Sequence, residues 1–434
     1  MISKHVEEET CGSSSNATLL FLQGPPGRFW GELAVACREA GFDVLKINQS
    51  LSEELAWRGP AEKINLDLIQ WPKWLEGFCR THSVTDILYY ADRQPYHVAA
   101  AEVAETLGIR AWVLENGYLR PDWLTFEPFG MSGLSRLPTD ASELDRLVEN
   151  TSKPDLAPIY SHGFWQEGRA EIFYGLVQSL GALRYPSYQT DRYYSPALDY
   201  LSWVCRAWQW CRSIGARRRL QERIKRGEIS FNLLALQLQS DYQIRVLSPY
   251  EHLSEMLREV ISSFASSAPS CRHLVVKGHP LDNGWENWPQ HLRRLAREKN
   301  VEHRVHWLDG GKLEDLLLQT EGLITVNSTV GVKALLQDCP VIALGSAIYN
   351  RSGLTHQEGI GSFWQTPTPP DSPSRERFLR ALIAWGQFRG SFYDPAGRTD
   401  AANAITKRLK LVQILTSSSN PLCQAFGNDN SVVL

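Results

Sequence analysis

The chain has 434 residues, of which 43% are hydrophobic and 21% are charged, and its formal net charge is -3. This length exceeds that of most single domains, so we expect two domains, each able to bury a core. The near-neutral charge argues against a general affinity for nucleic acid. The sequence contains no run of about 18 uncharged apolar residues, which excludes a helix that spans a membrane.

Residues 1–16 are polar and lack the charged-then-apolar layout of a signal peptide. The eight cysteines are scattered without the spacing of zinc ligands, which is typical of a protein from a reducing compartment. We therefore predict a cytoplasmic protein with a disordered N-terminus over residues 1–16. Any contact with a membrane would be peripheral.

Residues 17–150 predict a Rossmann-like domain on the acceptor side of a cleft. A strand over 17–22 runs into the turn Gln23-Gly24-Pro25-Pro26-Gly27, and a helix over 29–40 and a strand over 44–47 follow. A second set of elements is a strand over 86–90, a loop over 91–97, a helix over 98–107 and a strand over 111–114. The last of these strands places Glu115 at its end.

Residues 151–230 predict a connecting helical segment that is aromatic first and basic afterwards. The part from 203 to 226 begins with Trp203, ends with Arg226 and contains the run Arg217-Arg218-Arg219. Aromatic side chains beside cations suit an anionic membrane surface or a lipid acceptor. The alternative is a solvated linker helix that packs on the edge of a domain.

Residues 231–370 predict a second Rossmann-like domain, with strands over 233–236, 274–277, 304–307, 322–326 and 341–344 and helices over 313–319 and 330–337. Helices over 375–388 and 401–414 follow within a C-terminal region, 371–415, and residues 416–434 predict a disordered tail. Two Rossmann-like domains that face a central cleft are the GT-B arrangement of glycosyltransferases, in which the last helices often cross back over the first domain.

Several acids could act at the cleft. Glu115 at the end of its strand could serve as a base or a nucleophile toward a sugar carbon, or it could be a structural acid paired with Arg120. Asp92 and His97 offer a second acid and a proton partner, and Asp122 is a further candidate, as is Glu127. Gln23, Gly24, Arg93 and Arg120 are expected in the loops on the acceptor side.

A second group of residues predicts a nucleotide site. Lys277, His279 and Pro280 follow a strand, where a histidine can donate to a phosphate oxygen, although a His-Pro pair also occurs in ordinary turns. Asn327, Ser328 and Thr329 precede a helix, where they could bind a phosphate or simply cap the helix. Gln237 and Asp241 follow the first strand of the second domain and could line the same site.

Three motifs are absent from the sequence. The turn at residues 23–27 is neither the GxGxxG fingerprint of dinucleotide sites nor a phosphate-binding Walker loop. This disfavours a role for NAD or ATP, and no cofactor is expected. No Asp-X-Asp motif occurs, so we predict that no metal is required.

The chain resembles the capsule polysaccharide biosynthesis proteins of the KpsS/LipB type over residues 17–390. The most specific part is the run VNSTVGVKALLQDCPVIALGSAIYNRSGLT at 326–355. The resemblance is also carried by Gln23-Gly24-Pro25, by Asp92-Arg93 with His97, by residues 115–123 and 237–241, by Ser248-Pro249-Tyr250 and by residues 277–280.

This resemblance implies a retaining β-Kdo transferase that uses CMP-Kdo as its donor. The KpsS type places the first Kdo on a lyso-phosphatidylglycerol primer at the inner membrane, and a KpsC-type partner extends it. His279, Ser328 and Thr329 would then bind CMP, and Glu115 would lie at the catalytic centre. Related transferases often have two acids before the glycine, whereas Asn116 stands in the second place here, which leaves Asp92 and Asp122 as alternatives for the nucleophile.

Two other functions are compatible with the same features. One is another GT-B enzyme that uses a CMP-sugar, such as a sialyltransferase-like protein. The other is a non-catalytic scaffold in capsule assembly or export.

Overall fold

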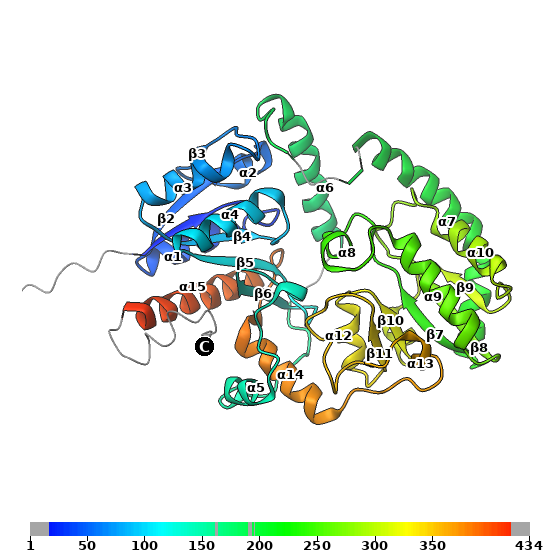
Figure 1. Ribbon diagram of the computed structural model, residues 1–434. Helices are drawn as coiled ribbons and strands as arrows, with labels where there is room; N and C mark the ends of the chain where they lie inside the picture. Colours follow the sequence, from blue (N-terminus) through cyan, green and yellow to red (C-terminus); the bar gives the residue numbers. More distant parts are fainter. Residues whose placement is uncertain (1–16, 161–163, 190–192, 195, 418–434) are drawn as a thin grey trace, which may run out of the picture.

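The computed structural model describes residues 17–160, 164–189, 193–194 and 196–417, which form two α/β units (Figure 1). The first unit is built on a seven-stranded sheet and the second on a five-stranded sheet. The predicted disordered segments at 1–16 and 418–434 lie outside the described residues, whereas residues 416 and 417 are the end of the last helix.

The first sheet has the strand order β12-β6-β5-β4-β1-β2-β3. Its strands are β1 (Thr18–Phe21), β2 (Asp43–Asn48), β3 (Glu62–Lys63), β4 (Val84–Tyr90), β5 (Arg110–Asn116), β6 (Trp123–Pro128) and β12 (Gln387–Arg389). The first five pair in parallel, whereas β6 and β12 are antiparallel to their neighbours. The parallel part has the strand order of a Rossmann domain, which reverses between β1 and β4.

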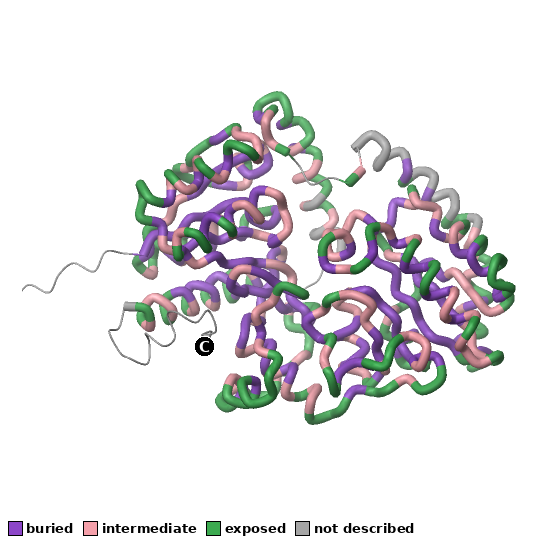
Figure 2. The backbone as a smooth tube through the Cα atoms, viewed as in Figure 1, coloured by how far each residue is buried: buried purple, intermediate pink, exposed green. Residues whose placement is uncertain are grey.

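Helices cover both faces of this sheet. They are α1 (Phe29–Glu39), α2 (Leu51–Ala56), α3 (Trp71–Thr81) and α4 (Pro95–Leu107). Along β1, Leu19 and Phe21 belong to the apolar cluster of α1, while Leu20 belongs to the cluster that contains Trp71 of α3 and Ala100 of α4. Successive side chains of a strand point to opposite faces, so both faces are buried, as Figure 2 shows.

The second sheet is parallel throughout and has the strand order β11-β10-β7-β8-β9. Its strands are β7 (Ser230–Ala235), β8 (Arg272–Lys277), β9 (Val305–Leu308), β10 (Leu323–Thr325) and β11 (Val341–Ala343). The accompanying helices are α8 (Tyr242–Leu247), α9 (Leu253–Ser267), α10 (Trp288–Glu298), α11 (Leu313–Leu317), α12 (Val330–Leu335) and α13 (Ile360–Phe363). This is again the Rossmann order, with its reversal between β7 and β10.

Three helices connect the two sheets. Residues 129–160 carry the turn η1 (Ser132–Leu134) and helix α5 (Ala141–Val148), and helix α6 (Phe164–Leu180) with the turn η2 (Gly181–Leu183) comes next. Helix α7 (Pro196–Lys225) is fixed to the second unit by a buried ion pair, in which Nη2 of Arg206 lies 2.6 Å from Oδ1 of Asp309. No helix in the described ranges is both long and apolar enough to cross a bilayer.

The chain returns to the first unit at its end. Helix α14 (Ser372–Trp385) contacts α5, strand β12 joins the first sheet at its edge, and α15 (Pro395–Ser417) packs against α1. Nε of Arg398 on α15 lies 2.8 Å from Oε2 of Glu32 on α1. The two Rossmann-like units with a final helix that crosses back have the predicted GT-B-type arrangement.

Several predicted elements differ from the structure at their boundaries, and the largest difference is at the helix expected over 401–414, which begins at Pro395. The helix expected over 375–388 ends at Trp385, because Gly386 lies against β6 and a Cβ there would be 2.8 Å from the carbonyl oxygen of Phe126. The loop expected over 91–97 ends earlier than predicted, because α4 begins at Pro95, whose fixed φ suits the first turn of a helix. His97 therefore lies on a helix.

Candidate active site

The candidate site lies where both parallel sheets reverse their strand order. In the first sheet β1 and β4 are followed by Gln23 and Asp92, and in the second sheet β7 and β10 are followed by Gln237 and Asn327. Ligands of doubly wound sheets bind at the carboxyl ends of the strands at such a reversal. Four predicted site residues therefore occupy the two positions where a ligand is expected, and Glu115 on β5 lies one strand away.

Glu115 is a half-buried acid with one oxygen held in place. The hydroxyl of Tyr90 and the backbone N–H of Asn116 both donate to its Oε1 at 3.0 Å. Among the described residues, Oε2 has no hydrogen-bond partner. Burial raises the pKa of Glu115 to about 7, while the hydrogen bond from Asn116 and the charge of Arg120 act in the opposite direction. Near neutral pH the side chain therefore exists in both protonation states.

Asp92 is where the two domains approach each other. Its Oδ2 accepts a hydrogen bond from the backbone N–H of Met131 at 3.0 Å, and Nε of Arg93 lies 3.8 Å from its Oδ1. Burial raises the pKa of Asp92, whereas Met131, Arg93 and Tyr242 lower it. Tyr242 belongs to α8 of the second domain, so the pKa of Asp92 depends on both halves of the chain, and Oδ1 of Asp92 forms no hydrogen bond with the described residues.

Arg120 lies between the acid of the first domain and the polar loops of the second. Its Nε donates to the carbonyl oxygen of Gly117 at 3.1 Å, and its side chain is exposed. Burial has the largest effect on the pKa values of Glu115, Asp241 and His279, and the positive charge of Arg120 lowers all three. Its guanidinium therefore acts on both domains. Glu115 and Arg120 form no ion pair in the described structure, so the predicted alternative of a structural salt bridge is not observed.

His279 is a neutral imidazole with a defined tautomer. Its Nδ1 accepts the backbone N–H of Leu281 at 3.1 Å, so the proton must be on Nε2, which can donate. Burial lowers the pKa of His279 to about 4, and the charges of Lys277 and Arg120 add to this effect. Lys277 is itself buried, which lowers its pKa, while Asp309 partly restores it. Pro280 is exposed beside them.

Gln237 and Asn327 are bound to each other across the strand reversal. Nε2 of Gln237 donates to Oδ1 of Asn327 at 2.9 Å, and the backbone N–H of Asn327 donates to Oε1 of Gln237 at 3.1 Å. Nδ2 of Asn327 donates to the carbonyl oxygens of Gln243 and Leu247. The hydrogen bonds of both side chains therefore hold β7, β10 and α8 together and fix the positions of these elements at the candidate site.

The same two loops of the second domain also have polar groups closer to the surface. Oδ1 of Asp241 accepts the backbone N–H of Gln243 at 2.9 Å and caps α8. Oγ of Ser328 accepts the backbone N–H of Val330 at 3.3 Å, and the side chain of Thr329 forms no cap on α12. The two hydroxyl groups can still donate to a ligand.

His97 stabilises the loop that contains Asp92. Its Nδ1 lies 2.8 Å from the carbonyl oxygen of Ala91 and must donate to it, and its ring stacks on Tyr89 with centroids 4.9 Å apart. The ring is fully buried, which lowers the pKa of His97 to about 4, and Nε2 has no partner among the described residues. This geometry suits a positioning role better than that of a proton partner for Asp92.

Two other candidate acids are engaged outside the cleft. Oδ2 of Asp122 accepts the backbone N–H groups of Ile159 and Tyr160 and lies 3.6 Å from Nη1 of Arg389. Glu127 on β6 is buried and accepts hydrogen bonds from Ser135 and Trp385, and burial raises its pKa to about 7. Through these hydrogen bonds and the ion pair, both acids connect the edge of the first sheet to later segments of the chain.

The acceptor-side loop is packed tightly. Oε1 of Gln23 accepts a hydrogen bond from the hydroxyl of Tyr188 at 2.8 Å. A Cβ at Gly24 would lie 2.4 Å from the ring of Trp30, so this position requires glycine. Arg93 extends from the next loop beside Asp92 and is half-buried.

Sequence reasoning missed Tyr90 and Tyr242, which contact or face the two acids. Tyr90 ends a predicted strand and Tyr242 follows a predicted site residue, but nothing in the spacing showed that either faces the cleft. No group of three or more His, Cys, Asp or Glu side chains suited to a metal ion occurs in the described ranges.

Comparison with known proteins provides the remaining findings. A family model for capsule polysaccharide biosynthesis proteins matches residues 85–393. The capsule polysaccharide export protein KpsS of Escherichia coli is 29% identical over 391 residues, which cover 87% of this chain and 97% of that protein. The capsule polysaccharide modification protein LipB of Neisseria meningitidis serogroup A is 28% identical over 394 residues, which cover 87% and 92%. Among solved structures, KpsC of Thermosulfurimonas dismutans, a beta Kdo 2,7 transferase, has 14% identity and a TM-score of 0.42, with coverage of 91% and 100%.

Proposed function

Since the chain belongs to the capsule polysaccharide biosynthesis protein family, we propose that it is a retaining glycosyltransferase that moves β-Kdo from CMP-Kdo to a lyso-phosphatidylglycerol primer. The observation that supports this most directly is the position of Arg120, whose charge acts on Glu115 of the first domain and on His279 and Asp241 of the second. In this proposal an acid and an anion-binding group share one site.

The second domain would bind the single phosphate of CMP-Kdo. Nε2 of His279 carries the proton it needs to donate, and Arg120 supplies a fixed positive charge. The hydroxyl groups of Ser328 and Thr329 and the cation of Lys277 would complete the contacts. Such groups neutralise a leaving phosphate without a metal ion, so we expect transfer to continue in the presence of EDTA.

Glu115 would perform the chemistry on the first domain. With a pKa of about 7, the carboxylate and the acid form of Glu115 are both present near neutral pH. The carboxylate could accept a proton from an acceptor hydroxyl, or it could attack the anomeric carbon. Oε2 is without a hydrogen-bond partner in the described structure and is therefore the oxygen available for either role. Asp92 is the next candidate for the nucleophile, because one of its oxygens is also without a hydrogen bond.

The proposed acceptor places the enzyme at the inner leaflet of the cytoplasmic membrane. Arg218 and Arg219 are exposed on α7, where they can face anionic lipids, and Trp203 is partly exposed on the same helix. A KpsC-type transferase would then extend the product. The export role in the name of the Escherichia coli relative supports a non-catalytic scaffold as the second candidate, and a sialyltransferase-like enzyme for another CMP-sugar is the third.

The decisive experiment is mass spectrometry of a reaction that contains the purified protein, CMP-Kdo generated in situ and a fluorescent lyso-phosphatidylglycerol. We expect a product heavier by one Kdo, no product with CMP-sialate, and loss of product in Glu115→Gln and His279→Ala. If a capsule-producing strain keeps its capsule with either variant at normal expression, the scaffold is correct and the transferase proposal is wrong.

A further inference from the structure

Helix α6 exposes a stripe of large apolar side chains, which we call the α6 stripe. It consists of Ile172, Phe173, Leu176, Leu180 and Leu183, and their exposed fractions range from 44% for Leu176 to 96% for Leu183. Positions 172, 176 and 180 recur at four-residue steps and therefore lie on one face of α6, and Leu183 follows in the turn η2. Contiguous apolar surface of this kind marks a site of contact with a protein or a membrane.

The α6 stripe is held in place by its C-terminal end. Gly181 lies so close to Leu51 of α2 that a Cβ there would be 2.6 Å from the Cβ of Leu51. Nε of Arg184 and the hydroxyl of Tyr185 both lie 2.9 Å from Oε2 of Glu54, which also belongs to α2. The stripe is therefore presented outward by a fixed attachment to the first domain.

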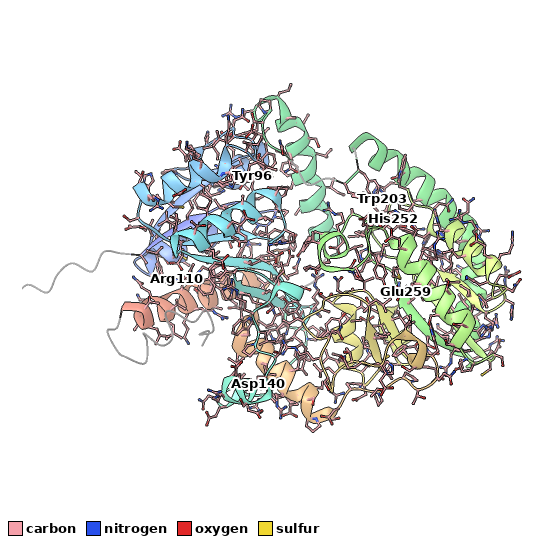
Figure 3. The ribbon with its side chains drawn as sticks, in the orientation of Figure 1. Tyr96, Arg110, Asp140, Trp203, His252 and Glu259 are labelled. Carbon is pink, nitrogen blue, oxygen red and sulfur yellow. The ribbon has the colours of Figure 1, made fainter. Side chains whose placement is uncertain are left out.

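The segment that follows this attachment in the chain contacts the acceptor side of the candidate site. Tyr188 follows directly in the chain, its hydroxyl donates to Gln23 at the carboxyl end of β1, and its ring stacks on Tyr96 with centroids 5.1 Å apart. Figure 3 labels Tyr96 on the part of the first domain that faces α6. A surface that binds α6 would consequently lie next to the loop expected to receive the acceptor.

We propose that the α6 stripe inserts into the interface of an anionic lipid bilayer and brings the first domain to its lipid acceptor. This inference rests on the lipid primer of the proposed function. In Figure 1, α6 lies at the top of the molecule beside the first domain, and α7 begins on the same side and runs down the right-hand edge of the second domain. The stripe would supply apolar contact, and the exposed Arg218 and Arg219 of α7 would attract the lipid phosphates.

An exposed arginine beside the α6 stripe suits a bilayer better than a protein partner. Arg169 is exposed and lies three and four residues before Ile172 and Phe173, which places it at the N-terminal end of the α6 stripe. In a bilayer interface a long arginine can bury its methylene groups and keep its charge among the headgroups. In a protein interface the same charge would need an acidic partner at the margin of the apolar contact, whereas the lipid phosphates supply one in an anionic bilayer.

The test measures binding of the purified full-length chain to vesicles of phosphatidylcholine mixed with phosphatidylglycerol. We expect Phe173→Gln/Leu176→Gln/Leu180→Gln to lower the partition coefficient by roughly tenfold or more, since about 1.4 kcal/mol of lost apolar burial corresponds to tenfold. The loss should persist at high salt. Arg218→Gln/Arg219→Gln should lower binding mainly at low salt, because exposed charges are screened.

Matched controls separate docking from folding. Ile69→Gln/Leu411→Gln replaces two exposed apolar residues on other elements and should leave vesicle binding unchanged. Leu183→Gln removes the most exposed member of the stripe, which has almost no packing to lose, and should weaken binding by a few-fold with an unchanged melting temperature.

Two results would overturn the inference. One is equal vesicle binding by the wild type and the triple variant. The other is a wild-type dimer in light scattering that becomes a monomer in the triple variant, while vesicle binding is the same for both proteins. A second copy of the chain would then be the occupant of the stripe. If the wild type binds vesicles through α6 but transfers no Kdo to any primer, the proposed function fails and the docking surface stands.

Discussion

Replacing Glu115 by glutamine should stabilise the protein at alkaline pH while abolishing transfer. The folded structure raises the pKa of Glu115 from 4.5 to about 7 because burial disfavours the charged form. At about 1.4 kcal/mol per pH unit, this difference makes the ionised side chain cost roughly 3 kcal/mol of folding free energy. Glutamine keeps the oxygen that accepts from Tyr90 and Asn116 and carries no charge.

The sign of this effect depends on pH. Below 4.5 the carboxyl group is protonated in both the folded and the unfolded chain, so the substitution should change little. As the pH rises toward about 7 the unfolded chain releases its proton first, and the wild type loses stability relative to the variant until the folded group ionises as well.

Urea unfolding monitored by tryptophan fluorescence measures this prediction. The gain in unfolding free energy of Glu115→Gln should be below about 1 kcal/mol near pH 5 and about 3 kcal/mol near pH 8. Glu62→Gln, at an exposed position on β3, is the control and should show no gain at either pH. An equal stability difference at both pH values would refute the idea that Glu115 is a strained, partly protonated acid.

Three further substitutions test other parts of the structure. His279→Ala should weaken CMP binding in calorimetry by about 1.5–3 kcal/mol, since a charge-assisted hydrogen bond is lost, and an unchanged affinity would exclude a phosphate role. Arg206→Met should lower the free energy of unfolding by about 3–5 kcal/mol because it leaves Asp309 buried without its partner, and the double variant with Asp309→Leu should recover most of the loss. Gly24→Ala should lower the melting temperature by forcing its Cβ against Trp30, at a cost of about 1–3 kcal/mol; no change would mean that the indole can move aside.

Much of the fold could be predicted because parallel strands are short apolar runs that end in polar loops. β1, β4, β5, β8 and β10 all appear in the sequence in this form, and the helices between them have clear apolar spacing. The antiparallel edge could not be predicted in the same way. Strand β6 and strand β12 are separated by more than half the chain, and β12 has only three residues, so its pairing with β6 overrides the helical pattern that precedes it.

The candidate site could be predicted to the level of loops but not of side chains. Asp92, His279 and Asn327 follow strands and Glu115 lies near the end of β5, and the rule about carboxyl ends predicted that they lie in one region. Which of them is available to a ligand depends on neighbours that are distant in sequence. Asn327 is occupied by Gln237, whereas Oε2 of Glu115 has no hydrogen-bond partner in the described structure.

The return of β12 and α15 to the first domain has a consequence for synthesis. Strands β1 to β6 of the first domain emerge from the ribosome before the second domain, yet the edge strand β12 and the helix α15, which packs against α1, are translated after it. The nascent chain therefore carries an open sheet edge and an uncovered apolar face while the entire second domain is made. Truncations within α15 should consequently be found in aggregates, and the first domain can complete its folding only after β12 and α15 have been made.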